Sequence, residues 1–197
     1  MANAFRPMGL SPVKTLNSSP WNDQANLYYI AAADTNAYAI GDPVVSSGSA
    51  DSNGVPGVTV ATAGAALRGV IVGLGTTEGL IANPSNLNQT IRPAGANASA
   101  YYAMVVDDPN VIYTVSEPNT GIALTAAAVG FNVNLVANAN NGYVSGWTLN
   151  NTGAAVTSTL QVKLLGLARV QGNAFGNGAQ WLVLINNHEL KAGTAGV

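Results

Sequence analysis

The length of the apolar segments is the feature that most constrains the fold. From Leu27 onward, apolar residues occur in runs of about four to eight, bounded by Gly, Pro, Asn, Asp and Ser. Runs of this length are typical of β-strands, because helices need longer segments with a period of 3.6 residues. The sequence therefore predicts an all-β fold: a single β-sandwich or barrel domain, with a jelly roll as the preferred architecture. The predicted strands are Leu27–Ala31, Pro43–Ser46, Val58–Ala61, Gly69–Leu74, Tyr101–Val106, Val111–Val115, Asn132–Val136, Gly146–Leu149, Leu160–Val170 and Gln180–Asn186.

The residues between these strands suit tight turns. Four connections contain residues that tolerate tight or left-handed backbone: 41–43, 51–54, 107–110 and 140–142. Asp107 to Asn110 lies directly between two predicted strands and indicates a hairpin-like reversal. Helical signal is confined to Thr62–Leu67 and Thr125–Val129, each sufficient for one or two turns, and Gly130 would cap the second.

The predicted centre of the core consists of two C-terminal segments. Leu160 to Leu164 alternates between apolar and polar residues, which places the two kinds on opposite faces of a strand. The sequence then continues to Val170 with apolar residues on both faces, and Gly166 is a candidate β-bulge. Trp181 to Ile185 is also apolar on both faces. We therefore expect these two strands to be covered on both sides.

Residues 1–20 predict an extended N-terminal arm, followed by a β-domain over 21–197. Pro7, Pro12 and Pro20 disfavour both a helix and a central strand. The apolar side chains between the prolines need a surface, which is either the body of the same subunit or a neighbour. The candidate partner-contact residues of the arm are Phe5, Arg6, Met8, Leu10 and Val13.

Ionisable residues are scarce. Charged residues make up 8% of the chain, compared with about 25% in typical soluble domains. The seven Lys and Arg are scattered and the net charge is −2, so the chain lacks the basic patch that binds nucleic acid. Because the chain carries few charges, copies of it repel one another only weakly, which favours association.

The start of the chain lacks the apolar core of a signal peptide, and no segment has the apolar length of a membrane helix. Synthesis in the cytoplasm and no membrane partner are therefore expected.

The inventory of reactive groups argues against an enzyme. Cysteine is absent and His188 is the one histidine, while the Gly-x-Ser-x-Gly serine motif is also absent, so a catalytic triad has little support. His188 follows the last strand, where we expect it at the surface or in an interface. Asp107 and Asp108 could form a calcium site only if the turn brought them together. Asp108 and Glu117 could form a glycosidase pair only across a cleft. The expectation is no enzymatic activity, no cofactor and no metal.

Aromatic residues leave a sugar-binding alternative open. Tyr28-Tyr29 and Tyr101-Tyr102 are adjacent on strands, so one ring of each pair faces outward, and an outward ring can contact a protein or stack on a sugar. Placement of Tyr and Trp in the core is the simpler interpretation. Trp147 is the residue whose replacement would test a sugar-binding groove.

Several motifs in order along the chain resemble a family of tailed-bacteriophage capsid decoration, or head cement, proteins. They are Ala4-Phe-Arg-Pro-Met-Gly-Leu10, Tyr28-Tyr29-Ile30, Tyr38-Ala-Ile-Gly-Asp-Pro-Val44, Arg68-Gly-Val-Ile-Val-Gly73, Val106-Asp-Asp-Pro-Asn-Val111 and Trp181-Leu-Val-Leu-Ile-Asn-Asn-His188. Each motif is a common turn-plus-strand pattern, and their order over nearly the whole chain carries the resemblance.

The resemblance implies a structural virion protein on the outer capsid surface that stabilises the capsid by bridging major capsid protein subunits. It implies the major capsid protein as partner, a dimer or trimer of the chain, and no catalytic residues. Removal of residues 1–12 is then expected to weaken attachment and leave the body folded. The alternative is a phage tail or fibre component that binds a receptor or sugar.

Overall fold

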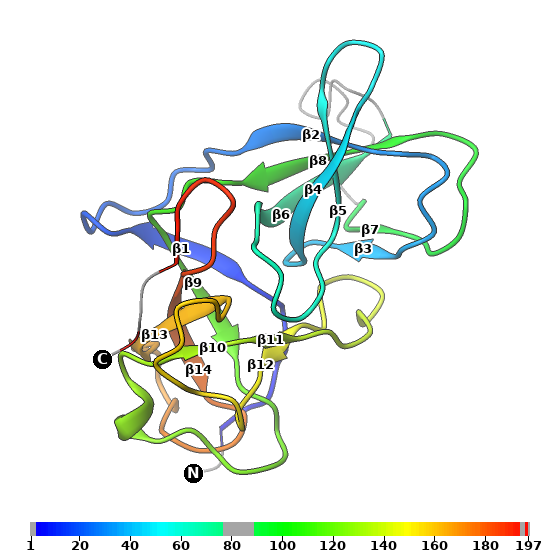
Figure 1. Cartoon of the computed structure of the whole chain (residues 1–197). Helices are drawn as coiled ribbons and strands as arrows, with labels where there is room; N and C mark the ends of the chain where they lie inside the picture. The colour runs from blue at the N-terminus through cyan, green and yellow to red at the C-terminus, as the bar shows by residue number, and fades with distance from the viewer. Residues whose placement is uncertain (1–2, 77–88, 194–195, 197) are drawn as a thin grey trace.

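The computed structural model describes residues 3–76, 89–193 and 196, and one of its two main bodies is a closed β-barrel (Figure 1). The barrel strands follow the order β2-β5-β4-β6-β8. Their bounds are β2 (Asn26–Ile30), β4 (Pro43–Ala50), β5 (Pro56–Val60), β6 (Gly69–Gly75) and β8 (Tyr101–Val106). The pair β2–β5 is parallel and the other pairs are antiparallel.

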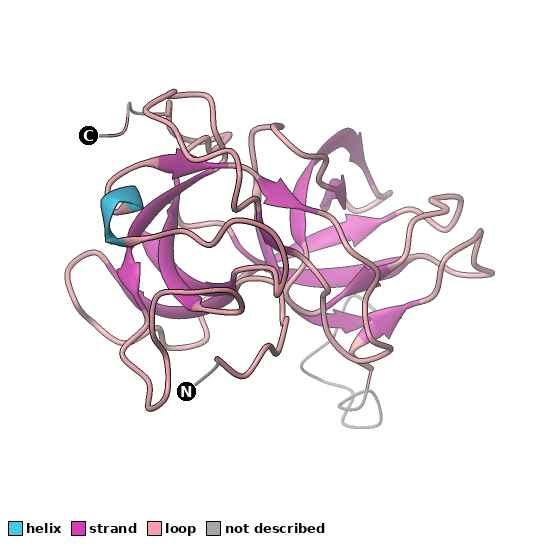
Figure 2. Cartoon of the chain, turned by 90° about the horizontal axis from the view of Figure 1, so that it is seen from below, coloured by secondary structure: helices cyan, strands magenta, loops and turns pink. Residues whose placement is uncertain are grey.

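The second body is a five-stranded antiparallel sheet beside the barrel, and Figure 2 shows the two bodies next to each other. Its order is β1-β9-β14-β13-β10. The bounds are β1 (Ser11–Thr15), β9 (Val111–Ser116), β10 (Asn132–Val133), β13 (Val162–Leu167) and β14 (Gln180–Ile185). The register between β13 and β14 shifts between Leu164 and Gly166, which confirms the predicted irregularity at Gly166.

Short elements complete the fold. The pair β3 (Tyr38–Ala39) and β7 (Ile91–Arg92) and the pair β11 (Leu135–Val136) and β12 (Thr148–Leu149) each form a two-stranded sheet. The helical signal at Thr125–Val129 corresponds to a single 3-10 turn, Ala126–Ala128. Gly130 follows it with φ of 91°. Thr62–Leu67 forms no helix, because its residues make turns and a bridge between the two bodies.

One hydrophobic core spans the contact between the bodies. The larger cluster of buried side chains joins Leu67, Val70 and Val106 from the barrel side to Tyr113 and Trp181 from the sheet. A second cluster, which includes Tyr28, Ile30, Val58 and Val105, fills the barrel interior. Separation of the two bodies would therefore expose buried apolar side chains to water, which is unfavourable.

The all-β prediction is confirmed, and the architecture differs from the predicted jelly roll. A jelly roll packs two sheets built from eight strands in two Greek keys, whereas the described strands form a closed five-stranded barrel and a five-stranded sheet. The expectation of a hairpin at Asp107–Asn110 is wrong. The turn forms, but β8 before it pairs with β2 and β6, and β9 after it pairs with β1 and β14. The turn therefore carries the chain from one body to the other.

From residue 3 onward, the N-terminal segment does not extend away from the body. Ser11 to Thr15 forms the edge strand β1, paired with β9, and Pro12 fits there because an edge strand tolerates a missing N–H donor. The chain then reverses and lies along the outer edge of β1, where the Trp21 amide donates to the Val13 carbonyl at 3.0 Å. Such coverage protects part of the edge from pairing with other strands.

Candidate interaction site

The segment before β1 crosses both bodies. The Asn3 side chain donates to the Ala174 carbonyl at 2.9 Å and accepts from the Ala174 amide at 3.0 Å, in the loop before β14. The Ser116 hydroxyl donates to the Arg6 carbonyl at 3.2 Å. The Leu10 amide then donates to the Gly41 carbonyl at 2.9 Å, on the barrel side. Residues 3–10 are thus fixed along their length by backbone and side-chain bonds.

A close approach between two glycines fixes the path at this crossing. Gly9 has φ of +63°, and a Cβ there would lie 2.2 Å from the Gly41 carbonyl oxygen. Gly41 has φ of +95°, and its Cβ would lie 2.2 Å from the Met8 carbonyl oxygen. A side chain at either position would clash with backbone and would adopt a strained conformation.

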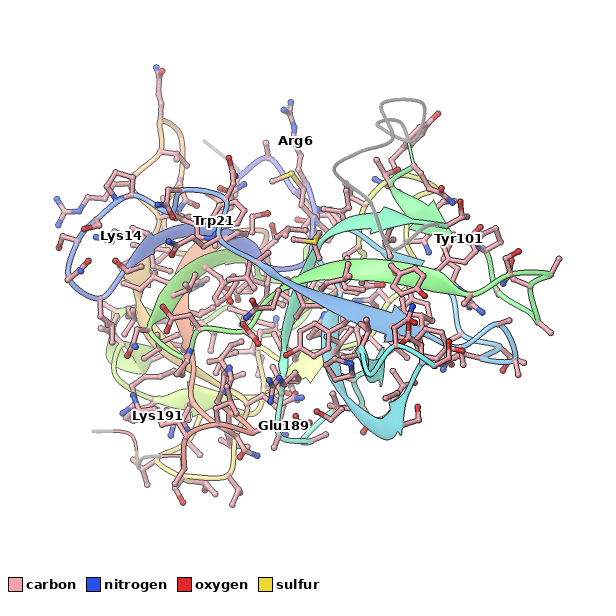
Figure 3. The ribbon with its side chains drawn as sticks, turned by 90° about the horizontal axis from the view of Figure 1, so that it is seen from above. Arg6, Lys14, Trp21, Tyr101, Glu189 and Lys191 are labelled. Atoms are coloured by element: carbon pink, nitrogen blue, oxygen red, sulfur yellow. The ribbon has the colours of Figure 1, made fainter. Side chains whose placement is uncertain are left out.

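The predicted contact residues separate into two groups. Phe5, Met8 and Val13 are exposed by 38%, 44% and 41%, and Arg6 is exposed as well and projects from the surface in Figure 3. Leu10 is only 1% exposed and belongs to the larger core cluster. Leu10 is therefore unavailable to a partner in this fold, because it packs against the body of its own chain.

Further apolar side chains flank the start of the segment. Val170 and Phe175, in the loop that holds Asn3, are 52% and 46% exposed. The Phe175 ring lies 5.5 Å from the Trp181 ring. Between residues 3–6 and this loop is a shallow cavity of about 240 Å³. Exposed apolar side chains that lie together around an ordered segment are typical of protein-binding surfaces.

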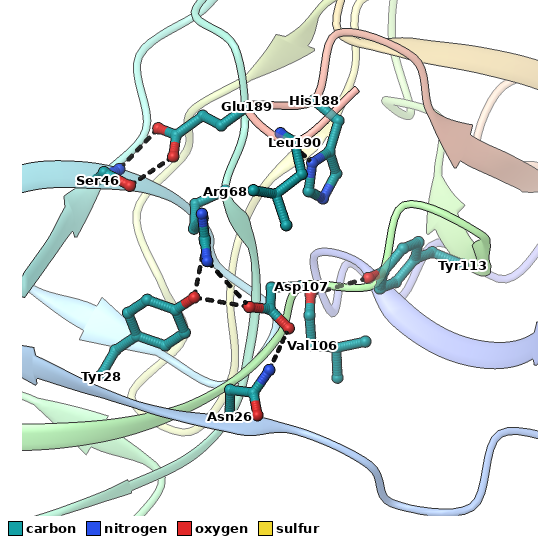
Figure 4. A network of polar contacts seen from close by, with 10 residues as sticks. All are labelled: Asn26, Tyr28, Ser46, Arg68, Val106, Asp107, Tyr113, His188, Glu189 and Leu190. Carbon is teal, nitrogen blue, oxygen red and sulfur yellow. Dashed lines mark hydrogen bonds and ion pairs between the residues drawn. The ribbon is translucent and has the colours of Figure 1, made fainter. Parts of the chain in front are cut away.

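A polar cluster lies at the junction between the bodies (Figure 4). Asp107 accepts hydrogen bonds from Tyr28 Oη at 2.6 Å and from Asn26 Nδ2 at 2.8 Å, and forms an ion pair with Arg68 at 3.4 Å. Arg68 Nε donates to Tyr28 Oη at 2.6 Å. Burial, followed by the hydrogen bond to Asp107, raises the pKa of Tyr28 to about 12. These groups satisfy one another and hold β2, β6 and the inter-body turn together.

The two adjacent aspartates do not converge. Asp107 contacts the barrel, whereas Asp108 accepts from the amide and the side chain of Asn110 within its own turn. Glu117 is fully buried and accepts from the Leu124 amide at 2.7 Å and from Trp181 Nε1 at 3.0 Å. Burial raises the pKa of Glu117. Among the described residues, no group of three or more His, Cys, Asp and Glu side chains is placed to hold a metal ion.

His188 is buried, and the expectation of a surface histidine is wrong. It is 3% exposed, and its Nδ1 accepts from the Leu190 amide at 3.0 Å. His188 forms a parallel β-bridge with Leu67, and Glu189 accepts from the Ser46 amide at 2.8 Å. Burial, and then the nearby Arg68 charge, lowers the pKa of His188. The C-terminal segment therefore fastens the sheet to the barrel.

The tryptophan proposed for sugar binding is also in the core. Trp147 is 3% exposed, although it borders a hollow of about 270 Å³ with Asp42, Val60 and Asn138. Tyr143, four residues earlier in the sequence, is 72% exposed and does not line this hollow. Asp42 is 5% exposed, and burial raises its pKa to about 6. Hydrogen bonds from Ser145 and the Ala39 amide lower this pKa, but the effect of burial is larger.

Two polar features of the fold were missed in the sequence. Arg92 is fully buried and donates to the carbonyls of Asn36, Asp34 and Ala31 at 2.6, 2.5 and 3.2 Å. Its guanidinium lies 5.4 Å from the Tyr38 ring and 5.5 Å from the Tyr101 ring. A single arginine between turn residues gives no pattern from which burial can be deduced. The same is true of the Arg68–Tyr28–Asp107 cluster, whose members come from distant strands.

No helix in the described part of the chain has the length and apolar character to span a membrane. No family model matches the chain, and neither a curated protein nor a solved structure is significantly similar to it.

Proposed function

We propose that the chain is a structural protein of a bacteriophage particle, which decorates the outer capsid surface and stabilises it by bridging major capsid protein subunits. The observation that carries the proposal is the N-terminal segment. It is fixed to the sheet body and to the barrel by hydrogen bonds, yet Phe5 and Met8 of this segment and Val13 of β1 remain exposed. A preordered apolar strip loses little conformational entropy when a partner covers it.

The chemistry of the remaining groups is consistent with a binding role. Asp107, Glu117 and His188 each have a structural partner, and Glu117 and His188 are buried. Their hydrogen bonds hold strands and loops in place. A capsid shell repeats the same contact many times at a high local concentration, so contacts that are weak individually can together give stable attachment. A modest apolar strip on each subunit then suffices for stable decoration.

The receptor- or sugar-binding alternative has weaker support. It requires aromatic faces along a groove, and Trp147 and Trp181 are 3% and 0% exposed. Tyr143 is 72% exposed, but it does not line the hollow that Trp147 borders.

The test is binding to capsid shells lacking the protein, measured by co-sedimentation and quantitative mass spectrometry. Deletion of residues 1–12 is unsuitable, because it removes Leu10 from the core and part of β1. The double variant Phe5→Ser/Met8→Ser changes side chains that are already exposed. We expect it to fold normally and to lower occupancy at least tenfold.

The matched control is Ile122→Ser, which removes a side chain that is 78% exposed outside the N-terminal segment. It should bind shells as the wild type does. Full occupancy by Phe5→Ser/Met8→Ser would refute the proposed contact surface, and failure of the wild-type chain to bind shells would refute the capsid role itself.

A further inference from the structure

A hollow beside Asp42 lies where the barrel meets the loop between β11 and β12. Figure 1 shows this loop below β3, and a parallel bridge between Ile40 and Val144 connects the loop to the residue after β3. The hollow measures about 270 Å³, and since a water molecule takes up about 30 Å³ in the liquid, a small organic group fits within it. It is lined by Ala37, Asp42, residues 60–61, residues 137–140 and Trp147. We call this space the Asp42 hollow.

Most of the lining is apolar. Val60, Ala61 and three further alanines contribute aliphatic groups, and Trp147, which is only 3% exposed, contributes its indole. The polar members are Asp42, Asn138 and Asn140. Mostly apolar walls with a small number of polar groups are typical of small-molecule sites. The polar groups therefore decide which chemistry the hollow accepts.

Asp42 is a buried acid without a counter-ion. It is 5% exposed, and its Oδ2 accepts a hydrogen bond of 2.7 Å from the Ala39 amide. No Lys, Arg or His of the described residues forms an ion pair with it, and the other residues that line the hollow are uncharged. Burial of an ionised carboxylate is costly unless a cation accompanies it. A ligand that brings a positive charge to Asp42 is therefore favoured.

Asn138 adds a neutral acceptor. Its Nδ2 donates to the Gly146 carbonyl at 3.2 Å and to Thr148 Oγ1 at 3.1 Å, which ties the amino group to its own loop. Its Oδ1 accepts from none of the residues that the structure describes. The Oδ1 of Asn140, in contrast, already accepts from the Gly142 amide at 3.1 Å. The lining thus offers one carboxylate and one neutral oxygen to a ligand that donates hydrogen bonds.

These groups match the chemistry of an aliphatic ammonium ion. An ammonium group has three N–H donors, a positive charge and no acceptor, so both the carboxylate and the amide oxygen suit it. Its hydrocarbon stem can lie along the apolar wall, as the stem of a lysine does on protein surfaces. A calcium ion takes about six to eight oxygen ligands, which suits a polar cage rather than these apolar walls. An anion would be repelled by Asp42.

We propose that the Asp42 hollow binds a primary alkylammonium group, with the charged nitrogen at the Asp42 carboxylate and the alkyl stem against Val60 and Trp147. A free alkylamine and the lysine side chain of a partner protein share this chemistry. The site uses none of the exposed side chains of residues 3–13, so it is independent of the proposed capsid contact.

Ionisation of Asp42 controls this binding. Burial raises its pKa to about 6, whereas an alkylammonium group keeps its charge to about pH 10. The neighbouring elements carry Tyr38, Arg92 and Tyr143, and none of these lines the hollow. Burial and the hydrogen bond to Asp34 raise the pKa of Tyr38 to about 12, so Asp42 is the group among them that titrates between about pH 4 and 8. Affinity for the amine should therefore rise with pH through about 6.

The first test is a titration with n-butylamine hydrochloride, followed by the methyl NMR shifts of Ala37, Ala61 and Ala137. At pH 8 we expect saturable shifts with a dissociation constant of about 1–10 mM, which is reasonable for so small a ligand. At pH 4.5 only about 3% of Asp42 is ionised, so the affinity should be at least tenfold lower. Butan-1-ol has the same stem and no charge, and it should bind at least tenfold more weakly than the amine at pH 8.

A pair of variants locates the charge that the amine requires. Asp42→Asn keeps an acceptor for the Ala39 amide and removes the charge, so it should lower the affinity for n-butylamine at least tenfold at pH 8. Asp108→Asn removes a carboxylate in an exposed turn outside the hollow and should leave the affinity within about twofold. The pH and butan-1-ol comparisons use the wild-type chain, so they hold whether or not Asp42→Asn folds. Equal binding of the amine and the alcohol, an affinity unchanged between pH 4.5 and 8, or no saturation up to about 100 mM amine would overturn the proposal.

A second probe distinguishes the two sources of the ammonium group. Nα-acetyl-lysine N-methylamide carries the butylammonium side chain on a peptide-like backbone. Binding within about tenfold of n-butylamine would assign the site to a lysine of a partner protein, whereas binding of n-butylamine alone would assign it to free amines. Failure of both probes would refute the ammonium site without bearing on capsid binding, which the exposed side chains of residues 3–13 test separately.

Discussion

The indole Nε1 of Trp181 donates a hydrogen bond of 3.0 Å to Oε2 of Glu117, and both side chains are fully buried. The other carboxyl oxygen of Glu117 accepts from the Leu124 amide. One acidic side chain thus connects the end of β9, the loop that follows it and the ring near the start of β14. It is a structural carboxyl, whose role is to accept two buried donors.

Glu117→Gln should destabilise the fold, since the amide offers one oxygen for two buried donors. A buried donor without an acceptor costs about 1–3 kcal/mol, and we expect that loss in urea unfolding. Asp108→Asn, in an exposed turn, should change stability by less than about 0.5 kcal/mol. Equal effects of the two variants would contradict the structural role of Glu117.

Asp42 should make stability fall as pH rises. Burial raises its pKa from 3.8 to about 6, so the folded state binds its proton more tightly than the unfolded state does. The stability contributed by this proton is complete below about pH 4 and is lost by about pH 6, an effect of about 3 kcal/mol at 1.36 kcal/mol per unit. Asp42→Asn keeps an acceptor for the Ala39 amide and removes the titration. The wild-type minus variant difference in unfolding free energy should decline across this range, and a constant difference would be evidence against a raised pKa.

The close approach of Gly9 and Gly41 should make Gly9→Ala unusually costly. The added Cβ would lie 2.2 Å from the Gly41 carbonyl oxygen, so the N-terminal segment must shift and Leu10 must leave its site. Gly48→Ala is the control, because Gly48 also has positive φ, +74°, but nothing lies within 4 Å of its Cβ. We expect Gly9→Ala to cost at least about 2 kcal/mol more than Gly48→Ala, measured by thermal unfolding. Similar melting temperatures would mean that the segment is not packed as described.

Arg92 is expected to be among the least replaceable residues. Arg92→Met keeps much of the volume but leaves the carbonyls of Asn36 and Asp34 without their donor, and should cost about 3–5 kcal/mol. Arg169→Met, at an exposed arginine, should be near neutral. Denaturant midpoints of the two variants compare them directly, and a small effect at Arg92 would show that its bonds contribute little.

The sequence predicted strands well where apolar runs are bounded by turns, as at Tyr101–Val106, which forms β8 with the predicted bounds. It missed β1, because Pro12 argued against a strand and the pairing with β9 depends on residues far along the chain. It also misplaced His188, since a residue after a strand carries no local mark of burial, whereas Trp147 lies in the core as the simpler interpretation of the sequence held. Of the proposed contact residues, Leu10 could not be told from Met8, because both are apolar side chains between prolines.

The order of strands along the chain has a consequence for how the molecule forms. All barrel strands lie within residues 26–106, whereas β1 must pair with β9 after that whole segment, and Thr114 contacts Ser11 across 103 residues of sequence. Contacts between distant residues form late, because closing a long loop costs chain entropy first. The barrel should therefore fold before β1 docks, and pulse-labelled amide exchange should protect β4 and β5 ahead of β1. The surface proposed to bind the capsid would then appear only on a finished subunit.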